Sequence, residues 1–398
     1  MRKRLIITAV AVAAATTQIF ATEGINLIGI GPVQQGTAGA GVASAKDSTW
    51  LILNPAGLVD IEPSMDASLQ LFAPVRTINS TASGGAGEQE DDSAFAIPSI
   101  SGSFGCCQGE NGFVGLGIYG TSGMGVDYNL GRIGDLSAGP PPTNPQNIGD
   151  KMTELSVVKM TATYAYKFDD SGLSIGAGPI FAISRLRTDM LNPNTFAFES
   201  GDWDTAYGAG AIIGVNQRLG ALSLGGSYMS ETFMSGFDEY DSLLGDSLNL
   251  PQQLTVGAAY NVLDNLELVL DYRWTGWKEL DTLGDTFGWD NQNIVKAGAT
   301  WGVSEALTLR GGISYGNSPI DEDTAFGNAL FPAIMETHLA CGASYAWEKW
   351  AAHIAYIHAL ENDITANGND AGPLAPIANG TTISMYQNSL TAGVTYKF

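Results

Sequence analysis

The chain has 398 residues, with 18 lysines and arginines against 41 aspartates and glutamates, a formal net charge of −23 and a mean hydropathy of +0.05. So acidic a balance excludes nucleic acid as a partner, because that role requires a basic footprint. After the N-terminal segment no stretch approaches about 18 uninterrupted apolar residues, which excludes membrane-spanning helices.

Residues 1–21 have the pattern of a secretory signal peptide. Three basic residues at 2–4 precede an apolar run over 5–15, and a more polar stretch leads to Ala21. The apolar run is too short to span a bilayer as a helix. We therefore expect export and cleavage after Ala21, with Ala15 as the alternative.

Residues 22–63 show none of the alternation expected of a strand. Glycine and alanine dominate 29–43, and the sequence Asn-Pro-Ala-Gly-Leu follows at 54–58. Small residues permit close packing against a wall, and a proline followed by glycine makes a rigid bend. We expect this segment to form a hatch inside a barrel.

From residue 64 onward, fourteen segments alternate between apolar and small or polar residues. They lie at 64–78, 94–105, 112–120, 153–168, 172–188, 203–217, 221–236, 251–262, 265–279, 291–303, 306–316, 336–347, 350–362 and 385–398. Short turns and long polar connections separate them in strict alternation. This pattern predicts an all-β fold, a 14-stranded antiparallel transmembrane β-barrel over 64–398 with both termini in the periplasm.

The last strand shows the alternation most clearly. Leu390, Val394 and Phe398 lie on one face, and Thr391 and Thr395 on the other. An apolar face toward lipid and a small or polar face toward the lumen is what a closed membrane barrel requires, since no backbone group can remain unpaired in hydrocarbon. The pattern indicates a bacterial outer-membrane protein.

Aromatic residues recur near the strand ends, and this recurrence favours girdles at the two membrane interfaces, whereas ordinary packing in the barrel explains each residue taken alone at least as well. The residues concerned are Tyr164, Tyr166, Trp274, Trp277, Trp301, Trp347 and Trp350.

The third predicted strand, 112–120, is rich in glycine and includes Gly115, Gly117 and Gly120. Glycine weakens strand pairing and permits a kink, so the strand has the composition to support a lateral opening in the wall. The same residues equally serve to make room for the hatch. The sequence leaves both interpretations open.

Successive side chains of a strand point to opposite faces, so the positions that alternate with the apolar, lipid-facing ones point into the lumen. Three cations occupy such positions: Lys296, Arg310 and Arg273. A fatty-acid carboxylate would need one or two such groups. Arg273 has Asp271 two residues away on the same face, so we expect these two to form an ion pair. Arg310 and Lys296 remain as candidate ligand-binding residues.

The sequence gives no sign of an enzyme, a cofactor or a metal site. Cys106 and Cys107 are adjacent, Cys341 is remote, and the three histidines form no cluster with ligand spacing. No serine motif accompanies a histidine in the way a hydrolase would require. We therefore expect no cofactor, no metal, no disulfide framework and no catalytic residues.

The order of these features resembles the FadL-type family, outer-membrane transporters of long-chain fatty acids and aromatic hydrocarbons. The motif at 54–58 carries most of the likeness, and patches at 266–277, 318–320 and 337–345 add to it. The resemblance covers essentially the whole mature chain. Substrate residues are poorly shared within the family, so no ligand contact is carried over by position.

The resemblance implies that Asn54, Pro55 and Ala56 belong to the hatch, and that a hydrophobic small molecule is captured outside, passes the rearranging hatch and leaves sideways at the third strand. Outer-membrane lipid and lipopolysaccharide are the expected surroundings of a monomer. A non-transporting accessory or structural barrel of the same fold is the alternative, since fold alone does not fix function.

Overall fold

The computed structural model describes residues 23–80, 87–105, 111–129, 132–134, 145–147, 150–168, 171–190, 192, 198–245, 247–369 and 375–398. The predicted signal peptide, 1–21, and Cys106 and Cys107 lie outside these residues, so the expectations for them stay predictions. Within the described chain no helix is long and apolar enough to cross a membrane.

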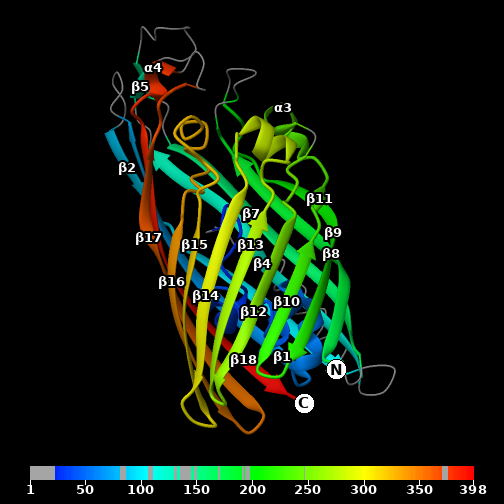
Figure 1. The fold of residues 1–398 in the computed structure, drawn as a ribbon. Coiled ribbons are helices and arrows are strands. Elements are labelled where there is room, and N and C mark those ends of the chain that lie inside the picture. Colours follow the sequence, from blue (N-terminus) through cyan, green and yellow to red (C-terminus); the bar gives the residue numbers. More distant parts are fainter. Residues whose placement is uncertain are drawn as a thin grey trace.

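Long antiparallel strands form a closed barrel, in which each strand pairs with the next along the chain and the first pairs with the last (Figure 1). Its strands are β1(Ser64–Ser80), β3(Phe95–Gly105), β4(Gly112–Asn129), β7(Asp150–Lys167), β8(Leu173–Thr188), β9(Asp204–Leu219), β10(Leu222–Met229), β12(Gln253–Leu263), β13(Leu266–Thr275), β14(Gln292–Gly302), β15(Leu307–Gly316), β16(Thr337–Trp347), β17(Trp350–Thr365) and β18(Thr382–Lys397). The prediction of 14 antiparallel strands is confirmed.

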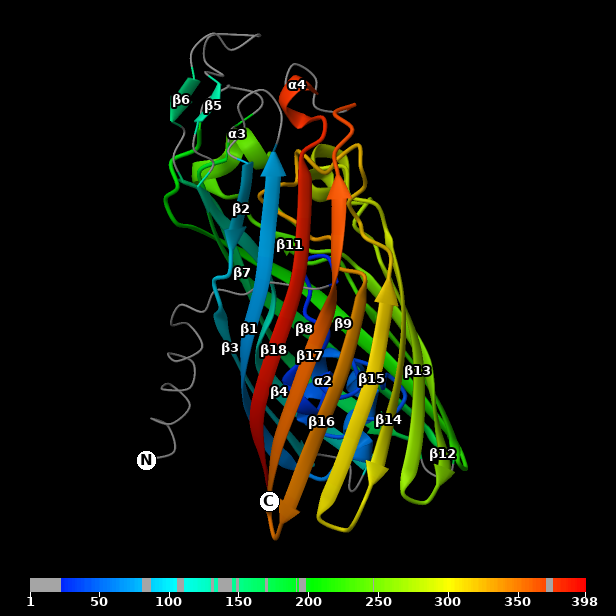
Figure 2. The ribbon, with the colours of Figure 1, turned by 90° about the vertical axis from the view of Figure 1, so that its left-hand side faces the viewer.

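Four shorter strands accompany the barrel. β2(Gly87–Asp91) pairs with β1, and β11(Phe233–Met234) pairs with β9. β5(Arg132–Gly134) and β6(Pro145–Asn147) pair only with each other. β2 therefore lengthens the ladder of β1 beyond its neighbour β3, at the end of the barrel that carries the long connections (Figure 2).

The last strand has the two faces that its sequence predicts. Leu390 and Val394 are each 45% exposed on the outer surface, whereas Thr391 is fully buried. β18 pairs with β17 on one side and with β1 on the other, from Ser64 opposite Lys397 onward. The exposed apolar positions recur around the described wall and make the lipid-facing surface of an outer-membrane barrel.

Two strand boundaries differ from the prediction. The third strand, β4, continues past 120 to Asn129, because a bulge between Gly120 and Ser122 restores its pairing with β7. The segment 221–236 is not one strand: β10 ends at Met229 and β11 follows after a break.

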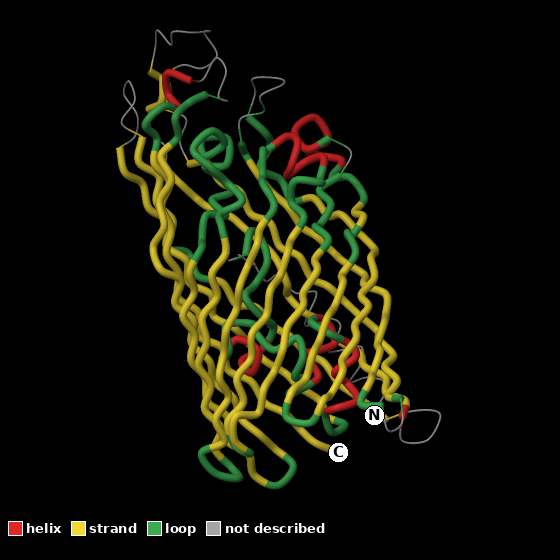
Figure 3. Tube along the Cα trace, in the orientation of Figure 1, coloured by secondary structure: helices red, strands yellow, loops and turns green. Residues whose placement is uncertain are grey.

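The sequence predicted long polar connections, but in the structure these connections also contain short helices and buried apolar side chains. The helices are η5(Asp238–Tyr240), α3(Asp241–Leu244), η6(Asp281–Thr286) and α4(Ala375–Ala378), which lie over the open end of the barrel (Figures 1 and 3). Buried apolar side chains from these connections pack together there: Phe237, Leu243, Leu244, Leu248, Trp277, Leu283, Trp289, Ile320, Phe331 and Ile334. The predicted girdle residue Trp277 belongs to this cluster and is fully buried, so its assignment to the girdle was wrong.

Residues 23–63, here called the interior segment, lie within the barrel. The segment contains α2(Gly31–Gln35), η1(Ser48–Ile52) and η2(Pro55–Asp60), which are visible between the strands in Figure 2. Nearly all of its side chains are buried, among them Ile25, Leu51 and Leu58 at 0% exposure. The lumen is therefore filled at the level of α2, η1 and η2.

Candidate ligand site

The Asn-Pro-Ala motif fixes the interior segment to the wall. The Asn54 side chain accepts a hydrogen bond from the Ala56 amide at 3.1 Å, which caps η2. Its amide nitrogen donates to the Val42 carbonyl at 2.7 Å and to the Val215 carbonyl of β9 at 3.2 Å. Because Asn54 is 0% exposed, these bonds satisfy a polar group that would otherwise be costly to bury.

Two glycines of the wall make the space for this motif. A Cβ on Gly214 would lie 2.0 Å from Asn54 Oδ1, and one on Gly176 would lie 2.5 Å from the carbonyl carbon of Pro55. Such distances leave no room for a side chain. The contact between motif and wall therefore depends on glycine in both β8 and β9.

The glycines of β4 are packed against neighbours in the same way. A Cβ on Gly115 would meet Leu51 at 2.0 Å, and one on Gly117 would meet the buried Tyr119 side chain at 2.0 Å. Gly120 stands at the bulge. For Gly115 the geometry favours the interpretation that small residues make room for the interior segment, and the lateral opening stays a prediction.

The upper part of β4 has an edge that β3 does not cover. β3 pairs with β4 only as far as Ser99 opposite Tyr119. Beyond that point the interior segment takes over: the Leu27 amide donates to the Thr121 carbonyl at 3.0 Å, and the Gly123 amide donates to the Ile25 carbonyl at 2.9 Å. The start of the described chain thus occupies a strand edge that would otherwise be open.

Glu23 is the centre of a buried ion cluster. One carboxylate oxygen lies 2.6 Å from Lys296 Nζ, and the other lies 3.0 Å from Arg273 Nη1. Burial alone would raise the pKa of Glu23, but Lys296 and Arg273 outweigh burial and lower it. Glu23 is therefore held ionised in the lumen.

The predicted pairing of Arg273 with Asp271 was wrong. Arg273 pairs with Glu23, and Asp271 instead accepts hydrogen bonds from the amides of Gly41 and Val42 at 2.7 and 2.9 Å. Both side chains thus hold the interior segment, at two different points.

The two candidate ligand cations point into the lumen as expected, but each has partners within the protein. Lys296 pairs with Glu23, and Arg310 donates to Ser344 Oγ at 2.5 Å. The side chain of Arg310 also lies against Gly36 of the interior segment. A ligand-binding role for either residue stays a prediction.

A cavity of about 50 Å³ lies between the interior segment and the wall, beside Arg273. Its lining mixes apolar and polar side chains: Asn26, Leu27, Ile30, Gln34, Ile52, Leu53, Thr121, Lys159, Met229, Gln253 and Arg273, with Gly29. The space is sufficient for a small polar group with a few waters, since one water needs about 10–15 Å³.

Lys159 is the residue of this cavity that the sequence analysis missed. It lies on β7, is 3% exposed, and its Nζ has one hydrogen-bond contact in the described chain, the sulfur of Met229 at 3.5 Å. No carboxylate of the described residues forms an ion pair with it. The alternation of the predicted strand 153–168 could have placed Lys159 in the lumen, because Lys159 occupies an inward-facing position of that strand, as Lys296 does of its own strand.

The charges around the cavity do not cancel. Lys159, Arg273 and Lys296 are cations, while Glu23 and Asp271 are the carboxylates that face them. The cluster therefore holds one cation more than carboxylates, and the surplus lies where Lys159 lines the cavity. Such a site can accept one further anionic group.

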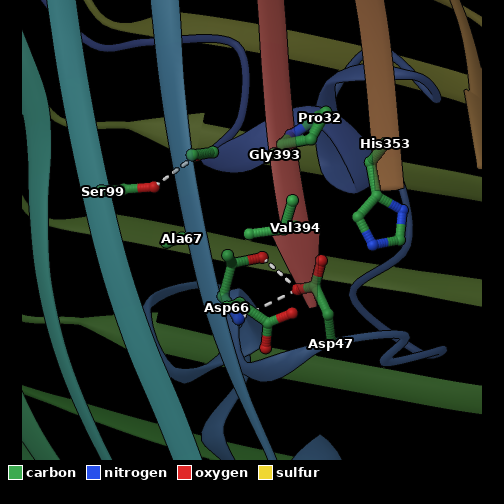
Figure 4. A pocket seen from close by; sticks show the side chains of 10 residues that line it. Pro32, Asp47, Asp66, Ala67, Ser99, His353, Gly393 and Val394 are labelled. Atoms are coloured by element: carbon green, nitrogen blue, oxygen red, sulfur yellow. Dashed lines mark hydrogen bonds between the residues drawn. The ribbon is translucent and has the colours of Figure 1, made fainter. Parts of the chain in front are cut away.

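A second, smaller cavity of about 10 Å³ lies where Asp47 of the interior segment approaches Asp66 of β1 and His353 of β17 (Figure 4). Asp66 accepts hydrogen bonds from Thr395 and from Ser48, which links the wall to η1. Burial and the neighbouring Asp66 raise the pKa of Asp47 to about 7. This contact is an anchor of the interior segment whose charge depends on pH.

His353 extends the anchor along the wall. Its Nδ1 is 2.7 Å from Ser344 Oγ, and its Nε2 is 2.9 Å from Thr395 Oγ1. Since Ser344 also receives the bond from Arg310, a continuous hydrogen-bonded chain runs from Arg310 to Asp66. These contacts indicate a positioning role for Arg310 in the fold.

Comparison with known proteins supports the resemblance seen in the sequence. Residues 209–398 match the family described as outer membrane protein transport protein (OMPP1/FadL/TodX). No curated protein matches the sequence.

Solved structures with the same fold cover almost the whole chain. A FadL homologue of Pseudomonas aeruginosa is 14% identical, with a TM-score of 0.68, and the match covers 94% of this chain and 100% of that one. The P. putida toluene transporter TodX is 16% identical, with a TM-score of 0.69, and the match covers 93% of this chain and 99% of that one. The Ralstonia pickettii toluene transporter TbuX is 18% identical, with a TM-score of 0.65, and the match covers 93% of this chain and 99% of that one. At such low identity these matches establish the fold, and the substrate must be argued from the site.

Proposed function

We propose that the chain is an outer-membrane transporter of hydrophobic compounds of the FadL/TodX type, and that it takes up long-chain fatty acids by passive transfer through the lumen. The proposal rests on one observation, the unpaired ammonium of Lys159 in an otherwise amphipathic cavity. An aliphatic hydrocarbon has no group that a buried cation could bind and an aromatic ring offers only a cation–π contact, whereas a carboxylate forms a charge-assisted hydrogen bond and neutralises the charge.

The charge balance supports an anionic ligand. Burying an ammonium without a counter-ion is costly, so a site with a surplus cation is incomplete until an anion arrives. A fatty-acid carboxylate placed between Lys159 and Arg273 would supply the missing negative charge. Its alkyl chain would lie along the apolar lining, which includes Leu27 and Ile52.

The small volume supports passage by rearrangement. A cavity of about 50 Å³ holds a head group but no long alkyl chain, so the interior segment has to move for a complete ligand to pass. The edge of β4 beside residues 25–27 is a suitable exit, because only two backbone hydrogen bonds close it there. We propose this edge, with Gly115, Gly117 and Gly120 below it, as the lateral route into the membrane.

The test removes the surplus charge and keeps the shape. Lys159→Met should weaken binding of a long-chain fatty acid by about tenfold or more, the typical value of one charge-assisted hydrogen bond. Binding of the fatty alcohol of equal chain length should not change. Lys167→Met, on the same strand but exposed, is the matched control.

Uptake in cells that lack their own transporter should follow the binding data. If Lys159→Met binds the acid as tightly as wild type does, the carboxylate site is wrong. If wild type binds toluene but neither acid nor alcohol, the protein is a carrier of neutral hydrocarbons. If it binds none of them, the accessory-barrel alternative is favoured.

A further inference from the structure

Two arginines occupy consecutive outward positions of β8. The outward positions of this strand are apolar from Ile175 to Ile183, and Arg185 and Arg187 follow, while the intervening Leu186 is fully buried toward the lumen. Ile183 pairs with Tyr207 of β9, which is 63% exposed. The arginines therefore begin one outward step beyond an exposed tyrosine at the edge of the apolar surface.

Tyrosines at the same end of other strands mark that edge around the wall. They are Tyr207, Tyr228, Tyr272, Tyr315 and Tyr386. Such a girdle lies at the level of lipid head groups. Arg185 and Arg187 thus lie at head-group depth, at the end of the barrel with long connections, which faces outward in outer-membrane barrels.

The guanidinium groups of both arginines make cation–π contacts with one tryptophan. The ring of Trp203, 39% exposed, lies 4.4 Å from the Arg185 guanidinium carbon and 4.8 Å from that of Arg187. Arg187 also pairs with Glu154 at 2.6 Å, whereas Arg185 has no ion pair or hydrogen bond within the described chain. The ring thus presents two guanidinium groups side by side, of which that of Arg187 forms an ion pair with Glu154 and that of Arg185 interacts with Glu154 electrostatically without an ion pair.

Cations are scarce elsewhere on this surface. The whole chain carries 41 acidic residues against 18 basic ones, and three of the basic ones lie in the predicted signal peptide. On the outward positions of the 14 long barrel strands, as far as the structure describes them, Arg185 and Arg187 are the basic residues beyond the tyrosine girdle. Asp127 near Arg187, and Lys151 paired with Asp189, are the other charges close by.

We propose that Arg185, Arg187 and Trp203 form a binding site for a phosphate group of an outer-leaflet glycolipid, the phosphorylated lipid A part of lipopolysaccharide. Guanidinium groups bind phosphate in a bidentate manner, and they remain charged at a membrane interface. Because acidic residues outnumber basic ones in the chain by 41 to 18, phosphate is repelled from most of the surface, and the two arginines determine where one lipid is bound. The apolar positions below, up to Ile183, receive its acyl chains.

The experiment compares lipid binding by purified barrels in detergent. Arg185→Ala with Arg187→Ala should lower the affinity for lipid A by about tenfold or more, measured by native mass spectrometry and by the rise in melting temperature on lipid addition. Lys278→Ala with Lys397→Ala removes two exposed cations elsewhere and should bind lipid A as wild type does. Heat-modifiable gel mobility verifies that each variant folds.

Three ligands separate the sources of binding. Lipid A should stabilise wild type, whereas dephosphorylated lipid A and inorganic phosphate alone should not. Arg185→Lys with Arg187→Lys keeps the charge but loses the bidentate geometry, so its affinity should fall between those of wild type and the alanine variant. Equal lipid A binding by the alanine and control variants would overturn the proposal, as would equal stabilisation by the dephosphorylated lipid or by free phosphate.

Discussion

Glu23 is the side chain that fixes the start of the described chain to the barrel wall, through two buried ion pairs. It pairs with two buried cations, and its neighbours Ile25 and Leu27 hydrogen-bond to β4. Because removal of one partner leaves buried charges uncompensated, such pairs are expensive to break even when their net contribution is small.

We therefore expect Glu23→Gln to loosen the contact between residues 23–27 and β4. The loss should be on the order of 3 kcal/mol, because two buried cations lose their counter-ion. Hydrogen exchange of the Leu27 amide should accelerate strongly, while exchange in β18 should stay unchanged. Glu62→Gln removes an exposed pair with Lys397 and should have little effect; equal protection in both variants would contradict this role of Glu23.

Asp47 gives the interior segment a dependence on pH. Its pKa rises from the ordinary value of 3.8 to about 7 in the folded protein, owing to burial first and Asp66 second, with Arg310 opposing. The folded state thus holds a proton that the unfolded state releases, so stability should fall as pH rises from about 4 to about 7 and then level off.

Asp47→Asn should remove this slope. The amide mimics the protonated acid and can still accept the bond from the Thr49 amide, so the variant should be as stable at pH 7 as wild type is near pH 4. Denaturation midpoints measured across this range test the expectation. A wild-type midpoint that rises with pH over the same range would show that the sign is wrong.

At the scale of elements, the fit between η2 and the wall sets a limit on residue size in β8 and β9. Gly214→Ala should destabilise the interior segment by about 1–3 kcal/mol, because its Cβ would lie 2.0 Å from Asn54 Oδ1. Gly226→Ala, where the nearest atom is 3.7 Å away, is the control and should be neutral. Similar melting temperatures for the two variants would contradict the close fit.

The strands were predictable and the connections were not, for a physical reason. Strand faces follow from a period of two within each segment, so even β18 could be assigned from its own residues. The bulge at Gly120 and the burial of Trp277 depend on neighbours distant in sequence. Alternation therefore missed the extension of β4 and the apolar packing of the long connections.

The same limit applies to the site. Parity placed Lys296 and Arg310 in the lumen correctly, and it would have placed Lys159 there as well. It could not identify Glu23 as the partner of Arg273, since 250 residues separate them and the interior segment has no periodic pattern. Position in the lumen was predictable from sequence, whereas ion pairing was not.

At the scale of the whole molecule, the interior segment and the wall form one filled barrel. Deletion of residues 24–58 should raise the single-channel conductance in planar bilayers, because it removes α2, η1 and most of η2 from the lumen. The wild-type protein should conduct little. A deletion variant that stays closed, or a wild type that conducts like a porin, would contradict a blocking role.

The seam between β1 and β18 has a consequence for the timing of assembly. Ser64 pairs with Lys397, so the first strand of the barrel receives its second neighbour only from the end of the chain. Until those residues are available, β1 keeps a free edge with unsatisfied amides and carbonyls, the kind of edge that recruits wrong partners. Ring closure is thus the last event that synthesis permits, and a chain that lacks β18 cannot complete its wall however well its other strands pair.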